Sequence, residues 1–463
     1  MDFRSYVRQN PAAAVTATAA LMCLMSLLQS ASGGDWSRFR GADGSGVSPE
    51  ATPPVEFGDA RNLSWKTPLP GPGASSPVIA DDRVIVTCWS GYGTGAGDPG
   101  RQEDLQRNVI CLDRRSGNVL WQHAEPAVLP EDTYRGMLAE HGYCSHTPVT
   151  DGERVYVFFG KTGVLALQLN DGVKLWHQQV GDGLEERRWG SASSPVLHGD
   201  LLIVAALIEG NSLIAFHKQT GEIAWKQEVP GYTGTWGTPV IVPGEGQRAE
   251  LVLAVPGEVW GVNPETGKLR WFCLVPGIDS VRASVIARDG VIYAMHGRGG
   301  GCVAIRAGGK GDVTSTHLVW QNDRDRNGIG TTVAVGGRLY LISNRVITSL
   351  DAGTGERIEQ LRLRAPSADG EAGAENSAEE FGPPYGRGGG AGQDYSSPVV
   401  GGDHLFYTAR SGDLFVVHLG DRMSQVAVNR LDSGGIDYSA TPAMADGQLF
   451  VRSASVLYCL SQK

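Results

Sequence analysis

A short strand-like signature returns eight times along this chain of 463 residues. Each copy places small or hydroxylated residues directly before apolar ones, as in SSPVI and GTPVI. The copies begin at Ser75, His146, Ser193, Gly237, Ala283, Thr331, Ser396 and Ala440. Most begin 44 to 48 residues after the previous one, and the two longer gaps contain insertions. A repeat of this length is typical of propellers and repeat arrays, so it constrains the fold more than any other feature.

One repeat has the composition of a four-stranded sheet. Residues 193–229 contain four short runs rich in β-branched and apolar residues, separated by turns with Gly or Asp. The last turn reads KQTGEIAW, in which a Trp follows the turn Gly by four residues. Equivalent Trp anchors are Trp121, Trp176, Trp225, Trp271 and Trp320. We predict that each of these side chains packs between neighbouring sheets, because one sheet cannot bury both of its faces alone.

The two ends of the chain complement each other. The last repeat holds only three strand-like runs before Lys463, whereas LSWKTPL at 63–69 resembles a fourth strand with Trp65 at the anchor position. The sequence therefore predicts an all-β fold, an eight-bladed β-propeller of four-stranded antiparallel blades over residues 62–463. Residues 62–69 are expected to complete the last blade and close the ring, which removes an open sheet edge. Residues 34–61 form a separate N-terminal segment.

The first 33 residues are typical of a secretory signal peptide. Arg4 and Arg8 precede an apolar stretch over 12–28, and small residues follow at 30–33. We expect an exported protein of the periplasm or cell envelope, with an uncleaved N-terminal anchor as the alternative. No other segment is apolar enough to span a bilayer. The formal net charge is −10 and no Lys/Arg run is present, which argues against a nucleic-acid partner.

The cysteines leave two alternatives open. Six of them follow the signal segment, and an exported protein can oxidise such thiols. Cys88 and Cys111 fall on consecutive expected strands and could form a disulfide, whereas the other interpretation is buried free thiols.

Three insertions are expected on one face of the propeller. Residues 89–107 follow a second strand, and residues 123–144 and 364–394 follow fourth strands. Loops after second and fourth strands of an antiparallel meander leave the sheet at the same end. Residues 364–394 are acidic and then Gly-rich, a composition that predicts disorder. Long loops on a rigid scaffold commonly carry binding sites, so we predict that this long-loop face is the functional one.

Residues just before each first strand are expected to surround a central funnel on this face. The candidates are Tyr143, His146, Arg188, Trp189, Trp236, Arg282, Asp394, Tyr395, Asp437 and Tyr438. Aromatic, Arg and Asp side chains around a concavity are typical of a site for a small ligand or a peptide. The alternative is a hydrogen-bonded lining that holds only water.

The segment DRDRNG offers a weak metal candidate. Asp323, Asp325 and Asn327 alternate before Gly328, as in the first half of a calcium loop. The acidic residue expected at the twelfth position is replaced by Ala334. The interleaved arginines provide the alternative, in which the acids form salt bridges.

The turn-and-Trp pattern resembles that of a known family. SGNVLW, TGEIAW and TGKLRW resemble the tryptophan-docking repeats of quinoprotein alcohol dehydrogenases, which are eight-bladed propellers. In those enzymes pyrroloquinoline quinone (PQQ) lies between a Trp and a disulfide of adjacent cysteines, near calcium and an Asp base. This chain has no pair of adjacent cysteines.

A closer resemblance is to the PQQ-like propellers of BamB type, which are non-enzymatic scaffolds for outer-membrane assembly. The opening DWSRFRGADGSGVSP at 35–49 is similar to the start of many exported PQQ-like propellers. The resemblance implies an exported, monomeric, non-enzymatic propeller that binds a protein or small ligand of the cell envelope on its long-loop face, without a cofactor. The alternative is a redox enzyme that uses PQQ and calcium, or another redox group, in the central funnel.

Overall fold

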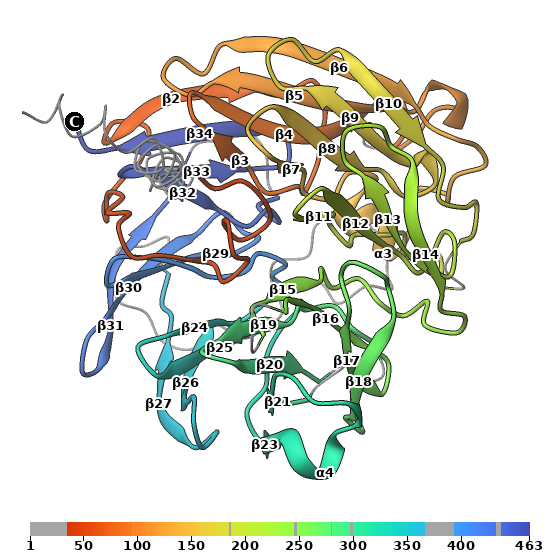
Figure 1. The fold of residues 1–463 in the computed structure, drawn as a ribbon. Helices are drawn as coiled ribbons and strands as arrows, with labels where there is room; N and C mark the ends of the chain where they lie inside the picture. Colours follow the sequence, from red (N-terminus) through yellow and green to blue (C-terminus); the bar gives the residue numbers. More distant parts are fainter. Residues whose placement is uncertain are drawn as a thin grey trace, which may run out of the picture.

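The computed structural model describes residues 35–463 apart from 96, 185–186, 245–247, 279, 297–299, 366–392 and 432–436. The expected signal peptide and most of the insertion at 364–394 lie outside these described residues. The described strands form eight sheets that follow one another in a ring around a central axis (Figure 1). An all-β, eight-bladed propeller is therefore confirmed.

The first four blades follow the chain order. Blade 1 is β3 (Val78–Ala80), β4 (Arg83–Ser90), β5 (Gln106–Asp113) and β6 (Val119–Pro126). Blade 2 is β7 (Val149–Thr150), β8 (Arg154–Phe158), β9 (Val164–Gln168) and β10 (Lys174–Gln178). Blade 3 is β11 (Val196–His198), β12 (Leu201–Ala206), β13 (Ser212–His217) and β14 (Ile223–Glu228). Blade 4 is β15 (Val240–Val242), β16 (Glu250–Val255), β17 (Glu258–Val262) and β18 (Leu269–Leu274), with β22 (Gly311–Asp312) parallel to its outer edge.

The remaining blades complete the ring. Blade 5 is β19 (Ile286–Arg288), β20 (Val291–Met295), β21 (Cys302–Arg306) and β23 (Leu318–Asn322). Blade 6 is β24 (Val333–Val335), β25 (Arg338–Ser343), β26 (Val346–Asp351) and β27 (Arg357–Arg362). Blade 7 is β28 (Val399–Gly401), β29 (His404–Thr408), β30 (Leu414–Leu419) and β31 (Met423–Asn429), with β1 (Val47–Ser48) parallel to β28. Blade 8 is β32 (Ala443–Ala445), β33 (Gln448–Arg452), β34 (Val456–Ser461) and β2 (Leu63–Pro68). Short helices are η1 (Gln102–Asp104), α3 (Met137–His141), η2 (Gly160–Thr162) and α4 (Thr314–His317).

Strand β2 closes the ring, as the sequence predicts. It pairs antiparallel with β34, and Trp65 lies opposite Cys459 in this register. Figure 1 shows the two strands, from opposite ends of the chain, side by side. The outer edge of blade 8 is therefore paired within the chain.

A ring of hydroxyl groups joins the inner ends of the blades. Each blade has a Ser or Thr two residues before its first strand, namely Ser76, Thr147, Ser194, Thr238, Ser284, Thr331, Ser397 and Thr441. From blade 1 to blade 8, the backbone N–H of each of these residues donates to the hydroxyl oxygen of the next, at 2.8–3.0 Å. The repeated Ser/Thr signature thus satisfies backbone groups that would otherwise be buried without a partner.

Outside this hydroxyl ring, Trp anchors connect the blades in the predicted way. Trp176 of blade 2 donates its indole N–H to the Lys218 carbonyl of blade 3 at 3.0 Å and lies against the turn glycine Gly221. The same arrangement joins Trp65, Trp121, Trp225 and Trp320 to the blade that follows each of them. Trp271 differs, because its indole donates to Glu250 and covers Gly261 within its own blade.

The N-terminal segment enters the channel from the face opposite the long loops. Trp36 forms backbone hydrogen bonds with Ile79 of β3 in both directions, at 3.1 and 3.0 Å. Arg40 is 1% exposed, and its guanidinium donates to the carbonyl oxygens of Ser45, Thr331, Thr332 and Pro398. Three of these carbonyls belong to the entries of blades 6 and 7. The segment 35–48 therefore acts as a plug in the channel. The sequence predicts only a separate N-terminal segment for these residues.

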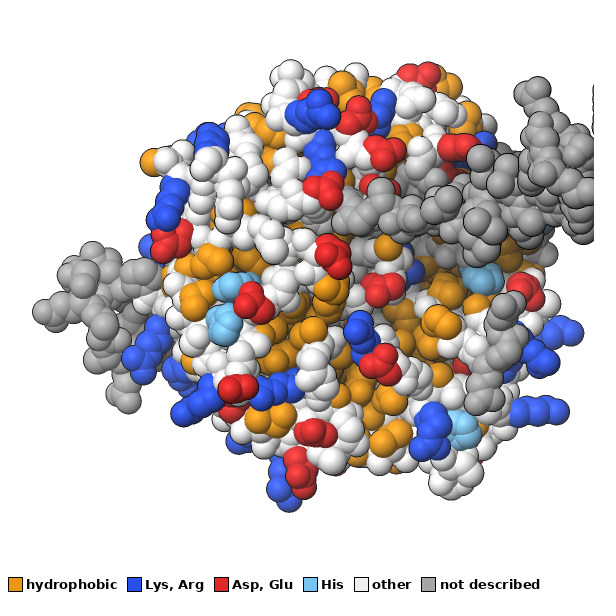
Figure 2. Space-filling model, turned by 60° about the vertical axis from the view of Figure 1, so that its left-hand side comes forward, with side chains coloured by type: hydrophobic (Ala, Val, Ile, Leu, Met, Phe, Trp, Pro, Cys, Tyr) orange, Lys and Arg blue, Asp and Glu red, His pale blue; other side chains and the backbone are white. Residues whose placement is uncertain are grey.

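The outer surface carries mixed charge. In the view of Figure 2, basic side chains are interspersed with acidic ones, and apolar side chains gather between them. Exposed aliphatic residues lie on or beside outer strands, for example Val173 (56% exposed) and Ile223 (54%). The described side chains on this side form no continuous basic stripe of the kind that nucleic acids require.

The docking of Trp onto turn glycines can be tested by substitution. A Cβ at Gly221 would lie 2.7 Å from the Trp176 ring, whereas a Cβ at Gly199 would meet nothing within 4 Å. Both glycines have positive φ, so alanine costs roughly 1–2 kcal/mol of backbone strain at either position. We expect Gly221→Ala to lower the free energy of unfolding by about 2 kcal/mol more than Gly199→Ala, because only the former overpacks the blade interface. Equal losses in urea unfolding would contradict the docking.

The contribution of the plug can be measured at Arg40. Arg40→Met keeps a long, unbranched side chain but leaves buried carbonyls without hydrogen-bond donors. We therefore expect a loss of roughly 2–4 kcal/mol in unfolding free energy. Arg61→Met is the control, since Arg61 is an exposed arginine paired with Glu56 and such pairs contribute at most about 1 kcal/mol. A plug that does not stabilise the ring would give similar melting temperatures for both variants.

Candidate functional site

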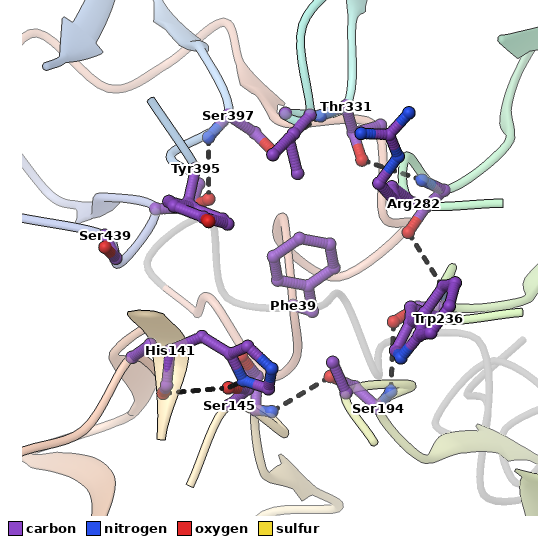
Figure 3. A pocket seen from close by; sticks show the side chains of 18 of the residues that line it. Phe39, His141, Ser145, Ser194, Trp236, Arg282, Thr331, Tyr395, Ser397 and Ser439 are labelled. Atoms are coloured by element: carbon purple, nitrogen blue, oxygen red, sulfur yellow. Dashed lines mark hydrogen bonds between the residues drawn. The ribbon is translucent and has the colours of Figure 1, made fainter. Parts of the chain in front are cut away.

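A partly open central cavity of about 160 Å³ lies in the channel at the level of the hydroxyl ring. Four of the predicted funnel residues line it, namely Trp189, Trp236, Arg282 and Tyr395. They come from the links that enter blades 3, 4, 5 and 7, so blades far apart in sequence build one wall (Figure 3). The indole rings of Trp189 and Trp236 pack with centroids 5.5 Å apart, and the Trp236 indole donates to the Gly190 carbonyl.

Two further segments line the cavity. Phe39 of the plug lies at the centre of the ring of lining residues (Figure 3). Met137 and His141 of α3 line it from the long loop between blades 1 and 2. His141 is held by the Trp189 carbonyl at 2.6 Å and the Ser145 hydroxyl at 2.7 Å. Burial lowers the pKa of His141, so its imidazole is neutral near pH 7.

An ion network ties the long loop to the opposite side of the ring. Arg410, in the turn after β29, binds Glu140 of α3 and Asp437, the latter at 2.9 Å. The guanidinium also lies 5.5 Å from the ring centre of Tyr395. Burial raises the pKa of Tyr395 to about 12, so its phenol stays protonated. These contacts hold α3 across the ring from blade 2 to blade 7.

The other predicted funnel residues have different positions. Tyr143 and Tyr438 are buried in the core, where their hydroxyls donate to the Asp132 and Leu431 carbonyls. Arg188 pairs with Asp132 at 3.1 Å. Asp394 accepts hydrogen bonds from the Tyr407 hydroxyl and the Arg410 amide. These residues, with Asp437, support the wall but are not among the residues that line the central cavity.

His146 lies in a second, smaller cavity of about 30 Å³ beside the first. Its Nε2 is 2.8 Å from the Ser191 hydroxyl, whereas its Nδ1 and the Glu209 Oε2 have no partner among the described residues. Burial raises the pKa of Glu209 to about 7 and lowers the pKa of His146 well below its usual range. A cavity of this size fits a water molecule that could satisfy both orphan atoms.

The calcium candidate is occupied by protein contacts. Asp325 is 4% exposed, pairs with Arg357 and accepts from Asn322 at 3.0 Å. Asn327 donates to the Gly330 carbonyl and accepts from the Ile342 amide, while Asp323 accepts from Gln321. Asp325 therefore forms its salt bridge with Arg357 of β27 and not with the interleaved arginines, and the calcium site stays a prediction. The described residues contain no group of three or more acidic, His or Cys side chains that could hold a metal.

The cysteines are free thiols. All six described cysteines are buried, and none forms a disulfide. Cys88 lies opposite Asn108, and Cys111 lies opposite Ile85, so the two proposed partners are out of register. Burial raises the pKa of Cys88 to about 11. The cavity lining also has no carboxylate among its described residues, and Phe39 occupies its centre, so it does not fit a quinone held by a disulfide and calcium.

Sequence reasoning missed the plug and the hydroxyl ring as parts of the site. The eight ring residues were visible as the repeated signature, but nothing in one repeat reveals that their hydroxyls meet at a channel. Phe39 lies in the segment 35–49 that resembles the start of exported propellers, and that resemblance assigns it no role. Its position depends on contacts with residues about 300 positions away, such as Arg40 with Thr331.

The fold defines an eight-bladed propeller of the quinoprotein-like type. The chain belongs to the family described as outer membrane protein assembly factor BamB, which matches residues 60–183 and 105–361. No curated protein sequence matches the chain. Among the described residues, no helix has the length and apolar character needed to cross a membrane.

Solved structures share the fold at low identity. BamB from Moraxella catarrhalis is 12% identical, with a TM-score of 0.58 over 87% of this chain and 97% of that one. A europium-containing methanol dehydrogenase is 12% identical, with a TM-score of 0.63 over 93% and 98%. Quinohemoprotein alcohol dehydrogenase from Comamonas testosteroni is also 12% identical, with a TM-score of 0.60 over 93% and 81%. Both the BamB class and the enzyme class therefore share the architecture, and only the site can separate them.

The buried carboxyl of Glu209 predicts a pH-dependent stability. Its pKa is about 7 in the folded chain against an ordinary 4.5, so the folded state binds a proton that the unfolded state releases. Stability from this group is therefore lost as pH rises from about 4.5 to 7, by about 3 kcal/mol. We expect the melting temperature of Glu209→Gln to exceed that of the native protein by an amount that increases between pH 5 and pH 8. Glu222→Gln, at an exposed turn, is the control, and a pH-independent difference for Glu209→Gln would contradict the assignment.

Proposed function

We propose that this chain is an exported, non-enzymatic binding protein that recognises a protein or small ligand of the cell envelope on its long-loop face. The central cavity is the centre of that site. The observation that carries the proposal is a largely apolar pocket on the propeller axis, with no carboxylate among its described lining residues. Its polar lining consists of Ser and Thr hydroxyls, seven of which accept a backbone amide, together with His141 and Arg282.

Membership of the BamB family supports the scaffold role and the cell-envelope location in this proposal. The long loops add a shaped rim around the cavity. Residues 91–105 contact the loop between blades 1 and 2, where Gln102 donates to the Glu131 carbonyl at 2.9 Å. Tyr134 of that loop packs against Trp89, with centroids 6.1 Å apart. The two described insertions therefore form one rigid surface on the predicted face.

A redox enzyme with PQQ is the competing function, and likeness to methanol dehydrogenase is what favours it. The full-length chain is incubated with PQQ and calcium, and then assayed for bound-quinone absorbance and for dye-linked alcohol oxidation. We expect neither signal, because the lining offers no carboxylate ligands for calcium and no disulfide. Stoichiometric quinone binding with turnover would overturn the binding-protein proposal.

The location of the binding face can be tested in the native cell envelope. A photo-crosslinking residue replaces Arg135, an exposed position on the long loop beside α3. A second variant carries it at Leu269, 49% exposed on the outer strand β18. We expect a specific adduct from position 135 and none from position 269. Adducts from position 269 alone would move the binding surface to the outer rim.

A further inference from the structure

The central cavity has a wall of large apolar side chains that the fold holds in place. They are Phe39, Met137, Trp189, Trp236, Ile329 and Tyr395. Trp236 is 8% exposed, its ring packs with that of Trp189, and its indole donates to the Gly190 carbonyl at 2.8 Å. The Arg410 guanidinium lies 5.5 Å from the ring centre of Tyr395. A further flat ring can therefore pack against preformed aromatic surfaces, with little cost for ordering them.

Arg282 and His141 of the lining are already engaged within the protein. Arg282 interacts with other groups of the chain. Both ring nitrogens of His141 contact protein oxygens, and burial lowers its pKa, so the imidazole is neutral near pH 7. The described lining residues include no carboxylate. An ionised ligand would therefore lose its hydration without gaining an unengaged counter-charge, and the cavity favours a neutral ligand.

The hydroxyl ring gives this neutral lining a polar belt. All eight of its residues line the cavity, and each is at most 6% exposed. Seven of the hydroxyl oxygens accept a backbone N–H from the preceding blade, and among the described residues none of the ring hydroxyls donates its own proton to a protein acceptor. A hydroxyl group has one proton and two lone pairs, so these groups can still both donate and accept. The natural partner of such a belt is another uncharged hydroxyl group.

The cavity is accessible from the long-loop face. Phe39 lies at the centre of the lining residues (Figure 3), and its neighbours Arg38 and Arg40 are only 6% and 1% exposed, so the plug blocks the opposite end. The volume of about 160 Å³ accommodates one aromatic ring, since an apolar protein cavity of about 150 Å³ holds benzene. Because the cavity is partly open, a group attached to the far side of that ring can remain outside.

We propose that the central cavity binds an uncharged phenol group. The aromatic ring packs against Phe39, Trp236 and Tyr395, and the phenol hydroxyl exchanges hydrogen bonds with the hydroxyl ring. A free small phenol and a tyrosine side chain of a partner protein present the same ring and hydroxyl group, and the experiment below distinguishes these two sources. This assignment rests on the proposed function, since it names the ligand class of the same site.

Three neutral probes separate the contribution of the ring from that of the hydroxyl group. p-Cresol has both, toluene lacks the hydroxyl group, and 4-methylcyclohexanol lacks the aromatic ring. Each is titrated into the full-length chain by isothermal calorimetry at about pH 7, where a phenol is uncharged. We expect p-cresol to bind roughly three- to tenfold more tightly than either analogue, because each analogue loses a hydrogen bond or the aromatic packing. Toluene or 4-methylcyclohexanol binding as tightly as p-cresol would overturn the assignment.

The location of the bound phenol is tested by filling the cavity. Ala192 lines the cavity and is partly exposed, so Ala192→Phe places a ring in the proposed site. We expect p-cresol affinity to fall by at least about tenfold, because two rings cannot share this space. Ala224→Phe is the control, at a partly exposed alanine of β14 outside the cavity lining, and it should retain binding. Calorimetric melting establishes that each variant is folded, and p-cresol binding that survives Ala192→Phe would overturn the inference.

The source of the phenol is read from two blocked pentapeptides, in which pairs of glycines flank one tyrosine or one phenylalanine. Tighter binding of the tyrosine peptide supports a tyrosine of a partner protein, whereas binding of p-cresol and of neither peptide supports a free small phenol. Equal binding of the two peptides would contradict the role of the hydroxyl group.

Failure of this inference is distinguishable from failure of the proposed function. Absence of p-cresol binding to the native chain at millimolar concentration overturns the phenol assignment, independently of any variant. A specific crosslinking adduct from position 135 would still support the binding face in that case. Adducts from position 269 alone would reject that face, whatever the phenol titrations give.

Discussion

The ring of hydroxyl groups at the inner ends of the blades is the contact on which the architecture depends. First strands lie closest to the propeller axis, so the residues that precede them have little room and no access to bulk water. At seven junctions a Ser or Thr hydroxyl accepts the amide proton of the preceding blade, as Thr238 does for Ser194. A larger side chain there would close the channel, and an apolar one would leave a buried amide without an acceptor. The Ser/Thr signature that defines the repeat therefore supplies hydrogen-bond acceptors for backbone amides next to the crowded axis.

The cavity follows from the same constraint. Because the ring residues are small, a space remains on the axis, and it is filled from two directions. Segment 35–48 enters from one face and is fixed by the carbonyls around Arg40, which places Phe39 on the axis. Helix α3 reaches over from the other face and is held by Arg410. The plug and α3 thereby narrow the channel to a pocket with an apolar wall and a belt of hydroxyl groups.

Local patterns predicted the repeat, the number of blades and the closure by β2, because each is written in the spacing of turn glycines, Trp anchors and strand-like runs. Trp271 is instructive, since it has the same motif as Trp225 but bonds to Glu250 in its own blade. Of the ten funnel candidates, Trp189, Trp236, Arg282 and Tyr395 line the central cavity. Tyr438 stands at the position equivalent to Tyr395 yet points into the core, where its hydroxyl meets the Leu431 carbonyl. Equivalent positions in a repeat share backbone location but not side-chain direction.

The amino-acid sequence was sufficient to determine an eight-bladed ring closed by its own N-terminal strand, because strand periodicity and turn chemistry act over a few residues at a time. The composition of the site was decided only in three dimensions. Phe39, α3 and Arg282 meet through contacts that span most of the chain, such as Arg40 with Pro398 and Glu140 with Arg410. A local sequence pattern cannot predict these long-range contacts, because they depend on how all eight blades are arranged around one axis.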